Sequence, residues 1–237
     1  MKKSKHDCDL KSCFFCTLCL KDWLPAVDAN RKTYHYKKGE VIFKEGDPVT
    51  GVYFVYQGKV KVHKQWGDKE LIIRFANKGQ IFGHRGLGHN NIYPISGTAL
   101  EPTEACFIDI DFFSTTLKVN HEFLYNLMLF FADDLQESER RMRNLAHMPV
   151  RGRLAQALVA LEEKFGKTVE GYIDIHLSRQ DIASYVGSTY ETIFRLMNEF
   201  IEEDLVEISG KDITIKNNER LLTVTQESIA QASSQDK

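Results

Sequence analysis

The feature that most constrains this 237-residue chain is a change of hydrophobic period near Ile110. From Tyr34 to Ile110, short runs of β-branched and aromatic residues are separated by glycines such as Gly39, Gly46 and Gly58. Runs of this length bounded by turn residues are typical of short strands. We therefore expect a compact all-β barrel or roll in the first half of the chain, followed by a helical section.

The helical section begins with a heptad pattern. Its apolar positions are separated alternately by four and three residues, which predicts a long helix that pairs with a second copy of itself. Ser138 is the one polar position in this seam. Because a serine carries no charge, it should not repel its symmetry mate, and we expect a permanent homodimer. The seam consists of Leu124, Met128, Phe131, Leu135, Ser138, Met142 and Leu145.

Pro149 marks the end of this helix and the start of a second domain. The stretch "VRGRLAQALVALEEKFG" (150–166) predicts an amphipathic helix, "YIDIHL" (172–177) a short strand, and "VEISGKDITI" (206–215) a hairpin around Ser209-Gly210. The remaining helical segments lie between this strand and the hairpin.

Two short helices are expected between residues 178 and 204. Ser178 followed by Asp181 is close to a capping box, and Gly187 marks a tight turn before a second helix capped by Ser188 or Thr189. Two helices joined by such a turn and followed by a β-hairpin predict a winged helix-turn-helix. In that motif the N-terminal residues of the second helix contact base edges in the major groove of DNA.

The residue types on the second helix suit this role. Glu191 can accept a hydrogen bond from a cytosine amino group, and Arg195 can donate two to guanine. The domain from residue 148 onward is acidic, with ten Lys/Arg against fifteen Asp/Glu, but much of the acid lies in "NEFIEED" (198–204), which we expect to face away from the groove. The predicted phosphate contacts are Ser178, Arg179, Gln180 and Thr192, and the predicted outward-facing residues are Thr189, Tyr190, Glu191, Phe194 and Arg195.

Three cysteines near the N-terminus predict a metal site. Cys13, Cys16 and Cys19 have the C-x2-C-x2-C spacing of a three-ligand run in bacterial [4Fe–4S] sites, whose fourth ligand comes from elsewhere. Cys106, in "TEACFIDI" (103–110), is the candidate fourth ligand, which leaves Cys8 as a spare or alternative. Zinc bound by Cys8, Cys13, Cys16 and Cys19 is an alternative, and a dithiol redox sensor without metal is another.

Other classes of function find less support in the sequence. The glycine-rich stretch "GHRGLGHNNIYPISG" (83–97) does not lead from a strand into a helix as a nucleotide loop would. No nucleophile–base pair or flavin signature accompanies the cysteines, so an iron–sulfur redox enzyme is a weaker alternative and we expect no catalysis. Haem held by His63, His84 or His89 is a weaker alternative. No apolar run approaches the ~20 residues of a membrane helix, and the N-terminus lacks a signal-cleavage site. We expect a cytoplasmic protein with reduced thiols.

The order of these elements resembles that of the CRP/FNR superfamily of bacterial transcription regulators. "LSRQDIASYVGSTYETIFRLM" (177–197) is similar to the family's recognition motif, and "KKGEVIFKEGDPVTGVYFVYQGKVKV" (37–62) to its opening strands. The resemblance implies an α+β protein with a cupin-like jelly roll, a homodimer on pseudo-palindromic double-stranded DNA, and RNA polymerase as a partner. The expected divisions are a cysteine-rich segment (1–22), a β-roll sensor (23–118), a dimerisation helix (119–147) and a winged helix-turn-helix domain (148–237).

The resemblance also bears on the signal. Cyclic-AMP-binding members have a Phe-Gly-Glu sequence and a later Arg-Ser or Arg-Thr pair, whereas this chain has Phe-Gly-His at 82–84 and Pro-Ile-Ser at 94–96. We therefore do not expect cyclic AMP, although Arg85 leaves another anion open. The cysteine layout resembles the oxygen-sensing FNR branch in position but not in spacing. Family members read bases with the pair matched by Glu191 and Arg195, and this chain departs from common family residues at Tyr190 and Phe194.

Overall fold

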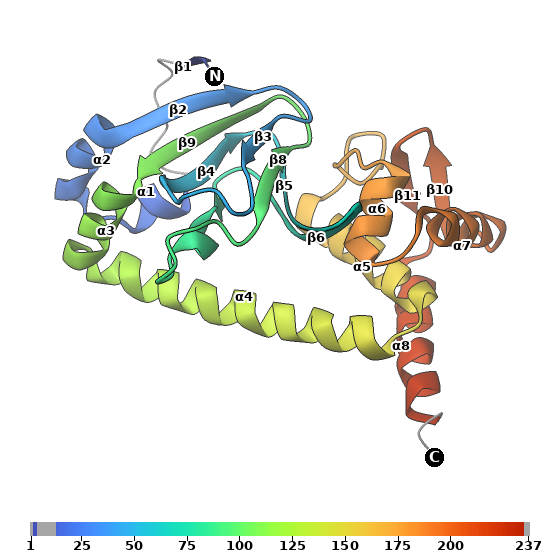
Figure 1. The fold of residues 1–237 in the computed structure, drawn as a ribbon. Coiled ribbons are helices and arrows are strands. Elements are labelled where there is room, and N and C mark those ends of the chain that lie inside the picture. The colour runs from blue at the N-terminus through green and yellow to red at the C-terminus, as the bar shows by residue number, and fades with distance from the viewer. Residues whose placement is uncertain (1, 4–12, 235–237) are drawn as a thin grey trace. The chain divides into compact units, whose positions relative to one another are not determined.

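The computed structural model describes residues 2–3 and 13–234. The chain forms two compact units, Met1–Leu135 and Gln136–Lys237, and the boundary between them falls inside the long helix α4 (His121–His147) (Figure 1). The first unit is a β-roll with helices, and the second is a helix-turn-helix with a β-hairpin. The predicted fold class, a β-roll followed by a long helix and a winged helix-turn-helix, is confirmed.

The roll consists of two antiparallel sheets. The five-stranded sheet has the order β1-β2-β9-β4-β7, and the four-stranded sheet has the order β3-β8-β5-β6. The strands of the first sheet are β1 (Lys2–Lys3), β2 (Arg31–Tyr36), β9 (Thr103–Asp109), β4 (Gly51–Gln57) and β7 (Ile81–Phe82), and those of the second are β3 (Val41–Phe43), β8 (Ser96–Ala99), β5 (Val60–Trp66) and β6 (Lys69–Ala76).

The five-stranded sheet has a core on each of its faces. Successive side chains of a strand point to opposite faces, so Tyr53 and Phe107 pack in the cluster between the two sheets. Their neighbours Phe54, Cys106 and Ile108 pack in a second cluster on the outer face of the sheet. Cys106 therefore faces away from the interior of the roll.

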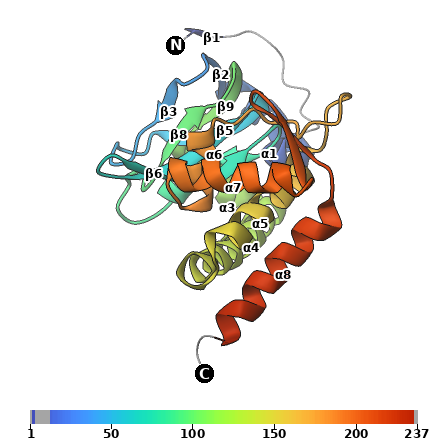
Figure 2. The same ribbon diagram turned by 90° about the vertical axis from the view of Figure 1, so that its right-hand side faces the viewer.

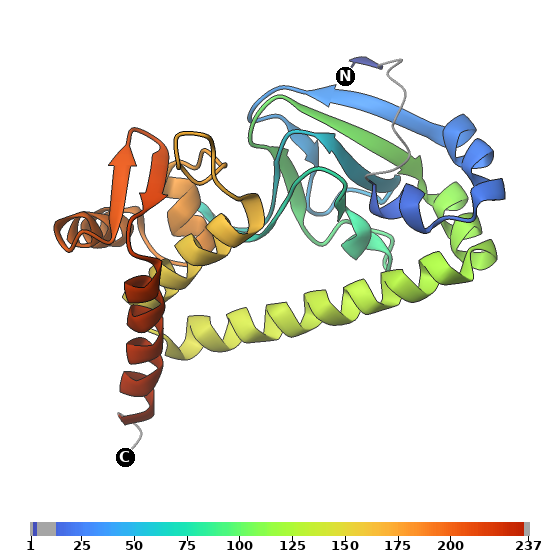
Figure 3. The same cartoon turned by 180° about the vertical axis from the view of Figure 1, so that it is seen from behind.

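Helices cover this outer face (Figure 3). Sequence analysis predicted neither the short helices that precede the roll nor the helix between β9 and α4. Their sequences are too short, or too mixed in period, to be told from the flanking strands and turns. The helices of this layer are α1 (Phe14–Leu18), the 3₁₀ turn η1 (Lys21–Trp23), α2 (Leu24–Asn30), α3 (Ile110–Val119) and α4, and a second 3₁₀ turn, η2 (His84–Gly86), follows β7.

The second unit contains the predicted helix-turn-helix and hairpin (Figure 2). Residues 172–177, expected to form a strand, do not form one. Ile173, Ile175 and Leu177 alternate as in a strand and are buried, but the backbone makes only an isolated bridge between Lys167 and Ile173. The C-terminal helix α8 was not predicted. The elements are α5 (Val150–Phe165), α6 (Arg179–Val186), α7 (Tyr190–Glu202), β10 (Val206–Ser209), β11 (Asp212–Ile215) and α8 (Asn218–Ser234).

Local sequence signals fix the helix-turn-helix. Ser178 and Asp181 form a complete capping box at the start of α6. Gly187 ends this helix with φ 72°, a left-handed conformation that favours glycine. Thr189, rather than Ser188, caps α7 by accepting a hydrogen bond from the Thr192 amide.

Candidate DNA-binding surface and cysteine site

Helix α7 has one buried face and one exposed face. Its buried residues are Ile193, Leu196, Met197 and Phe200. The opposite face is the candidate DNA-binding surface, as the 3.6-residue period of an amphipathic helix requires. The structure places every residue that was predicted to point outward on the exposed side, namely Thr189, Tyr190, Glu191, Phe194 and Arg195.

The side chain of Arg195 is 66% exposed and pairs with Glu199 one turn further along α7, at 2.5 Å. Glu199 also accepts a hydrogen bond from Arg151 of α5, as does Glu203. These contacts direct part of the "NEFIEED" acid toward α5. An exposed ion pair contributes only about 0–1 kcal/mol to stability. Arg195 can therefore leave Glu199 and bind a guanine with little loss of free energy.

The residues predicted to contact phosphate differ in their exposure and in whether their side chains already form hydrogen bonds within the protein. The Ser178 hydroxyl donates to Asp181 Oδ2 at 2.5 Å and accepts from the Asp181 amide at 3.0 Å, so it is already engaged in the helix cap. Gln180 is exposed, whereas Arg179 and Thr192 are half-buried. Burial lowers the pKa of Arg179, and neighbouring Tyr190 opposes this shift. The roles of these four residues stay predictions.

Arg153, which no sequence pattern singled out, positions the turn before α7. Its guanidinium donates to the carbonyl oxygens of Val186 and Gly187 at 3.0 Å each, and to that of Met148 at 2.7 Å. These are carbonyls at the end of α6 and just after α4, which no helical hydrogen bond satisfies. These carbonyls come together only in the folded protein, so no local sequence pattern predicts that Arg153 binds them.

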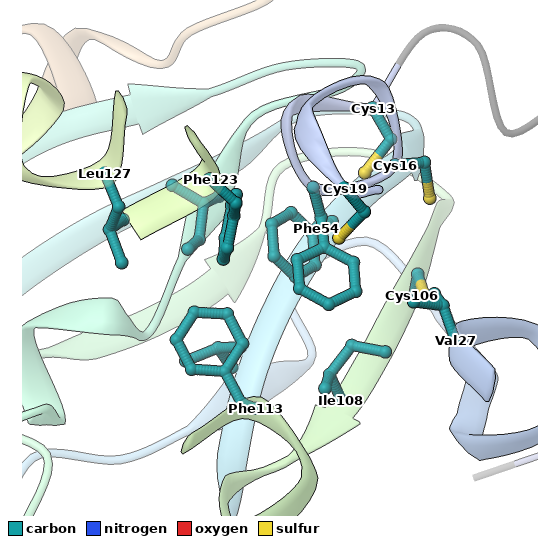
Figure 4. Packing of buried hydrophobic residues seen from close by; sticks show 13 residues of the cluster. Cys13, Cys16, Cys19, Val27, Phe54, Cys106, Ile108, Phe113, Phe123 and Leu127 are labelled. Atoms are coloured by element: carbon teal, nitrogen blue, oxygen red, sulfur yellow. The ribbon is translucent and has the colours of Figure 1, made fainter. Parts of the chain in front are cut away.

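All four candidate cysteine ligands that the structure describes are buried in the outer-face cluster. Cys13, Cys16, Cys19 and Cys106 are each 5–8% exposed, form no disulfide, and lie with Phe15, Phe54, Phe113 and Phe123 (Figure 4). Cys13 and Cys19 flank α1, Cys16 lies within it, and Cys106 comes from β9. The fold thus brings the N-terminal run and the distant fourth cysteine into one layer.

The donor set suits a thiolate-bound metal, but the thiols are not in ligand geometry. Among residues 2–3 and 13–234, no three His, Cys, Asp or Glu side chains are arranged to hold a metal ion. Burial, with a smaller effect of Cys13, raises the pKa of the Cys19 thiol to about 12, so this group stays protonated without a cation. Four soft sulfur donors in one apolar layer match the chemistry of an iron–sulfur or zinc site. Cys8 lies outside the described residues.

The cysteine segment is anchored at both ends. The Phe14 amide donates to the Gly79 carbonyl at 2.9 Å. Directly after Cys19, the Leu20 amide donates to Oδ1 of Asn120, the residue between α3 and α4, at 2.8 Å. The position of Cys19 is therefore tied to the start of α4.

Aromatic rings extend this link along α4. The Phe14 ring lies 5.8 Å from that of Phe123 and 5.5 Å from that of Phe130, and the rings of Phe15 and Phe123 are 5.0 Å apart. Phe123 and Phe130 lie about two turns apart on α4. The helix that carries Cys16 thus packs directly on α4.

The interior of the roll is filled by aromatic side chains. The ring of Phe43 lies 4.4 Å from that of Tyr93, 5.5 Å from that of Tyr53 and 6.0 Å from that of Phe82. A Cβ placed on Gly97 would lie 2.8 Å from the Phe43 ring, which shows how closely this ring approaches the sheet. These rings occupy the space between the two sheets.

His84, which stands where cyclic-AMP-binding members have a glutamate, contacts α4. Its ring lies 5.1 Å from that of Phe130 and 5.3 Å from that of Phe131, and its Nε2 is 3.9 Å from Asp134 Oδ2. The side chain is 2% exposed, and neither ring nitrogen has a hydrogen-bond partner among the described residues. Arg85 pairs with the same Asp134 carboxylate at 2.6 Å.

Two family descriptions match the two units. Residues 33–120 match the cyclic nucleotide-binding domain, and residues 152–224 match the Crp-like helix-turn-helix domain. Together with the fold, these matches define a winged-helix DNA-binding protein with an N-terminal β-roll of the cyclic nucleotide-binding type. The chain belongs to the CRP/FNR superfamily of transcription regulators, which are not enzymes.

Similar proteins include other transcription regulators. The chain is 25% identical over 201 residues to a CRP-like cAMP-activated global transcriptional regulator of Mycobacterium tuberculosis, with 84% of this chain and 90% of the relative covered. It is 26% identical over 215 residues to the transcriptional activator protein FnrA of Stutzerimonas stutzeri, with 88% and 87% covered. The fold is similar to that of FixK2 from Bradyrhizobium japonicum, with TM-score 0.73, 24% identity, and 82% and 96% covered.

These matches confirm the resemblance found in the sequence. Family membership implies DNA binding and a dimer. Among the described residues, no helix is long and apolar enough to cross a membrane.

The buried His84 predicts a loss of stability in acid. Burial lowers its pKa from 6.5 to about 4; Arg74 and Arg85 also lower it, and Asp134 opposes them. The unfolded chain therefore takes up a proton between pH 6.5 and about pH 4 that the folded chain does not, so stability falls as the pH falls through this window. We expect urea unfolding to show a loss of about 2 kcal/mol between about pH 7.5 and about pH 5 from this residue.

His84→Phe should remove this part of the pH dependence, and the exposed His89→Gln should keep it. An unchanged pH profile in His84→Phe would contradict the assignment.

Proposed function

We propose that this regulator senses oxygen, nitric oxide or redox state through a [4Fe–4S] cluster held by Cys13, Cys16, Cys19 and Cys106. It acts in the cytoplasm as a homodimer on pseudo-palindromic DNA, with RNA polymerase as a partner. The observation that carries the proposal is the burial of all four cysteines in one layer that packs on α4. When bound, the cluster supplies the reactivity toward small oxidants that a sensor requires.

The route from the cysteines to α4 follows from the contacts of α1. The structure has Phe14 and Phe15 against Phe123 and Phe130, and the Leu20 amide on Asn120. A cluster held by the four cysteines would fix the segment that carries these contacts, and its loss would remove that constraint. The position of α4, and through it the DNA-binding unit, then depends on the state of the thiols.

A cyclic nucleotide is not the signal in this proposal. The family's nucleotide-binding domain is present, but Phe43, Tyr53, Phe82 and Tyr93 fill the space between its sheets. The His84 ring packs against Phe130 and Phe131 of α4, and a histidine has no carboxylate to bind a ribose hydroxyl. The glutamate of Phe-Gly-Glu and the arginine of the Arg-Ser pair are both absent, because this chain has Phe-Gly-His at 82–84 and Pro-Ile-Ser at 94–96.

The proposed dimer uses the exposed apolar side chains of α4. Leu124, Met128, Leu135 and Met142 are 42–64% exposed, which is unusual for four large apolar residues in heptad register. Phe131, Ser138 and Leu145 are half-buried. A second α4 would cover these positions as a coiled coil.

The metal proposal predicts different outcomes for the individual cysteines. After anaerobic reconstitution with iron and sulfide, Cys106→Ser and Cys19→Ser should each lose most of the bound iron and the thiolate–iron absorbance, because each removes one of four ligands. Cys8→Ser is the matched control and should keep both. Circular dichroism checks that each variant is folded. Full metal content in Cys106→Ser, with zinc in place of iron, would favour the zinc site on Cys8, Cys13, Cys16 and Cys19.

The seam predicts the oligomeric state. Leu135→Glu or Met142→Glu would place two carboxylates against each other across the two-fold axis, and we expect monomers in sedimentation velocity. Trp66→Glu is the control, because Trp66 is 85% exposed and lies outside α4. Dimers in both seam variants would show that α4 is not the interface.

The base-reading role of Arg195 predicts a loss of sequence preference. Arg195→Ala should weaken binding to a specific duplex by about 1–3 kcal/mol in a titration by fluorescence anisotropy. Binding to a random duplex should change little. An equal loss on both duplexes would mean that Arg195 contacts only phosphate.

A further inference from the structure

Two aromatic side chains stack on the exposed face of α7. The rings of Tyr190 and Phe194 are 6.2 Å apart and nearly parallel, at 15°. The two residues are 43% and 49% exposed. They lie one helical turn apart, and Glu191 and Arg195 follow them directly in the sequence.

The fold of the unit does not account for this pair. The core of the helix-turn-helix is supplied by the other face of α7, through Ile193, Leu196, Met197 and Phe200. Leaving two rings partly in water forgoes the free energy that their burial would contribute, about 25 cal/mol per Å² of apolar surface. Two such rings next to charged residues therefore suggest a surface that becomes covered on binding.

The position of the pair identifies what covers it. Tyr190 and Phe194 are continuous with Glu191 and Arg195, the proposed base-reading residues, so the same groove faces all four. Base edges in the major groove are polar except for the C5-methyl group of thymine, and phenylalanine is among the side chains that contact it. We propose that Tyr190 and Phe194 form an apolar surface that selects thymine methyl groups beside the base pairs read by Glu191 and Arg195.

The spacing of the two rings limits how many base pairs they reach. Four residues of α-helix span about 6 Å along its axis, and successive base pairs are about 3.4 Å apart. The pair therefore covers at most about two base-pair steps, and we expect one or two selected thymines in each half-site. This inference rests on the proposed function, because it requires α7 to enter the major groove.

Replacing thymine by deoxyuridine tests the inference, because uracil lacks only the methyl group. A duplex is first selected from a random pool with the purified full-length protein, and its thymines are then replaced one at a time. Loss of one buried methyl should weaken binding about 3- to 10-fold at one or two positions per half-site. Replacement elsewhere should have little effect.

Variants assign the effect to the aromatic pair. Phe194→Ala and Tyr190→Ala should bind the thymine duplex more weakly and should no longer distinguish it from the uracil duplex at the affected position. Ile201→Ala is the matched control, since Ile201 is an exposed apolar residue on the same helix, two turns further on, and should keep the full thymine preference. Both aromatic side chains are exposed, so their removal leaves the core intact.

The possible results distinguish failure of the thymine inference from failure of the proposed base reading. Equal binding of thymine and uracil duplexes by the unmodified protein, with the dependence on Arg195 intact, overturns only the thymine inference. A thymine preference that survives in both alanine variants also overturns it. Failure to select any duplex would overturn the proposed base reading and the thymine inference together.

Discussion

The packing of Phe15 holds the first unit together on its outer face. Its ring contacts Phe54 of the five-stranded sheet at 5.2 Å, Phe113 of α3 at 5.8 Å and Phe123 of α4 at 5.0 Å. The residue is 1% exposed, and Cys16 follows it directly in the sequence. One buried ring therefore joins the cysteine segment, the sheet and the long helix, so that none of them can move without disturbing the others.

The five-stranded sheet separates two cores of the first unit. The space between the sheets, where the family's name places a cyclic nucleotide, is filled by Phe43, Tyr53 and Tyr93. The outer face holds the thiols instead. Strand β9 makes this division possible, because Phe107 faces the interior of the roll while Cys106 faces the helices. The proposed sensing through thiols would use the face of the sheet that contacts α4.

Sequence analysis predicted the features that have strong local signals. The heptad predicted α4, Ser178 and Gly187 predicted the ends of α6, and Ser209-Gly210 predicted the hairpin. The strand predicted at residues 172–177 is wrong, because alternate residues there are buried without the ladder of hydrogen bonds to a neighbouring strand.

Contacts between residues far apart in the sequence could not be predicted, because no local pattern indicates them. The link from Leu20 to Asn120 joins residues a hundred positions apart, and the Arg153 contacts depend on the ends of two other segments. The cysteines were predicted to meet, and the fold brings them into one cluster, but their ligand roles stay a prediction.

In the proposed mechanism, a change in the ligation of the thiols alters the affinity for DNA through the aromatic contacts of α1 with α4. The most direct test is the ratio of dissociation constants for a selected duplex between anaerobically reconstituted and air-exposed protein, measured together with iron content. Phe130→Ala removes the ring that Phe14 contacts, whereas Tyr125→Ala removes an exposed ring of the same helix. We predict that Phe130→Ala binds iron normally but brings the ratio close to one, and that Tyr125→Ala keeps the ratio of the unmodified protein. An unchanged ratio in iron-loaded Phe130→Ala would contradict the account.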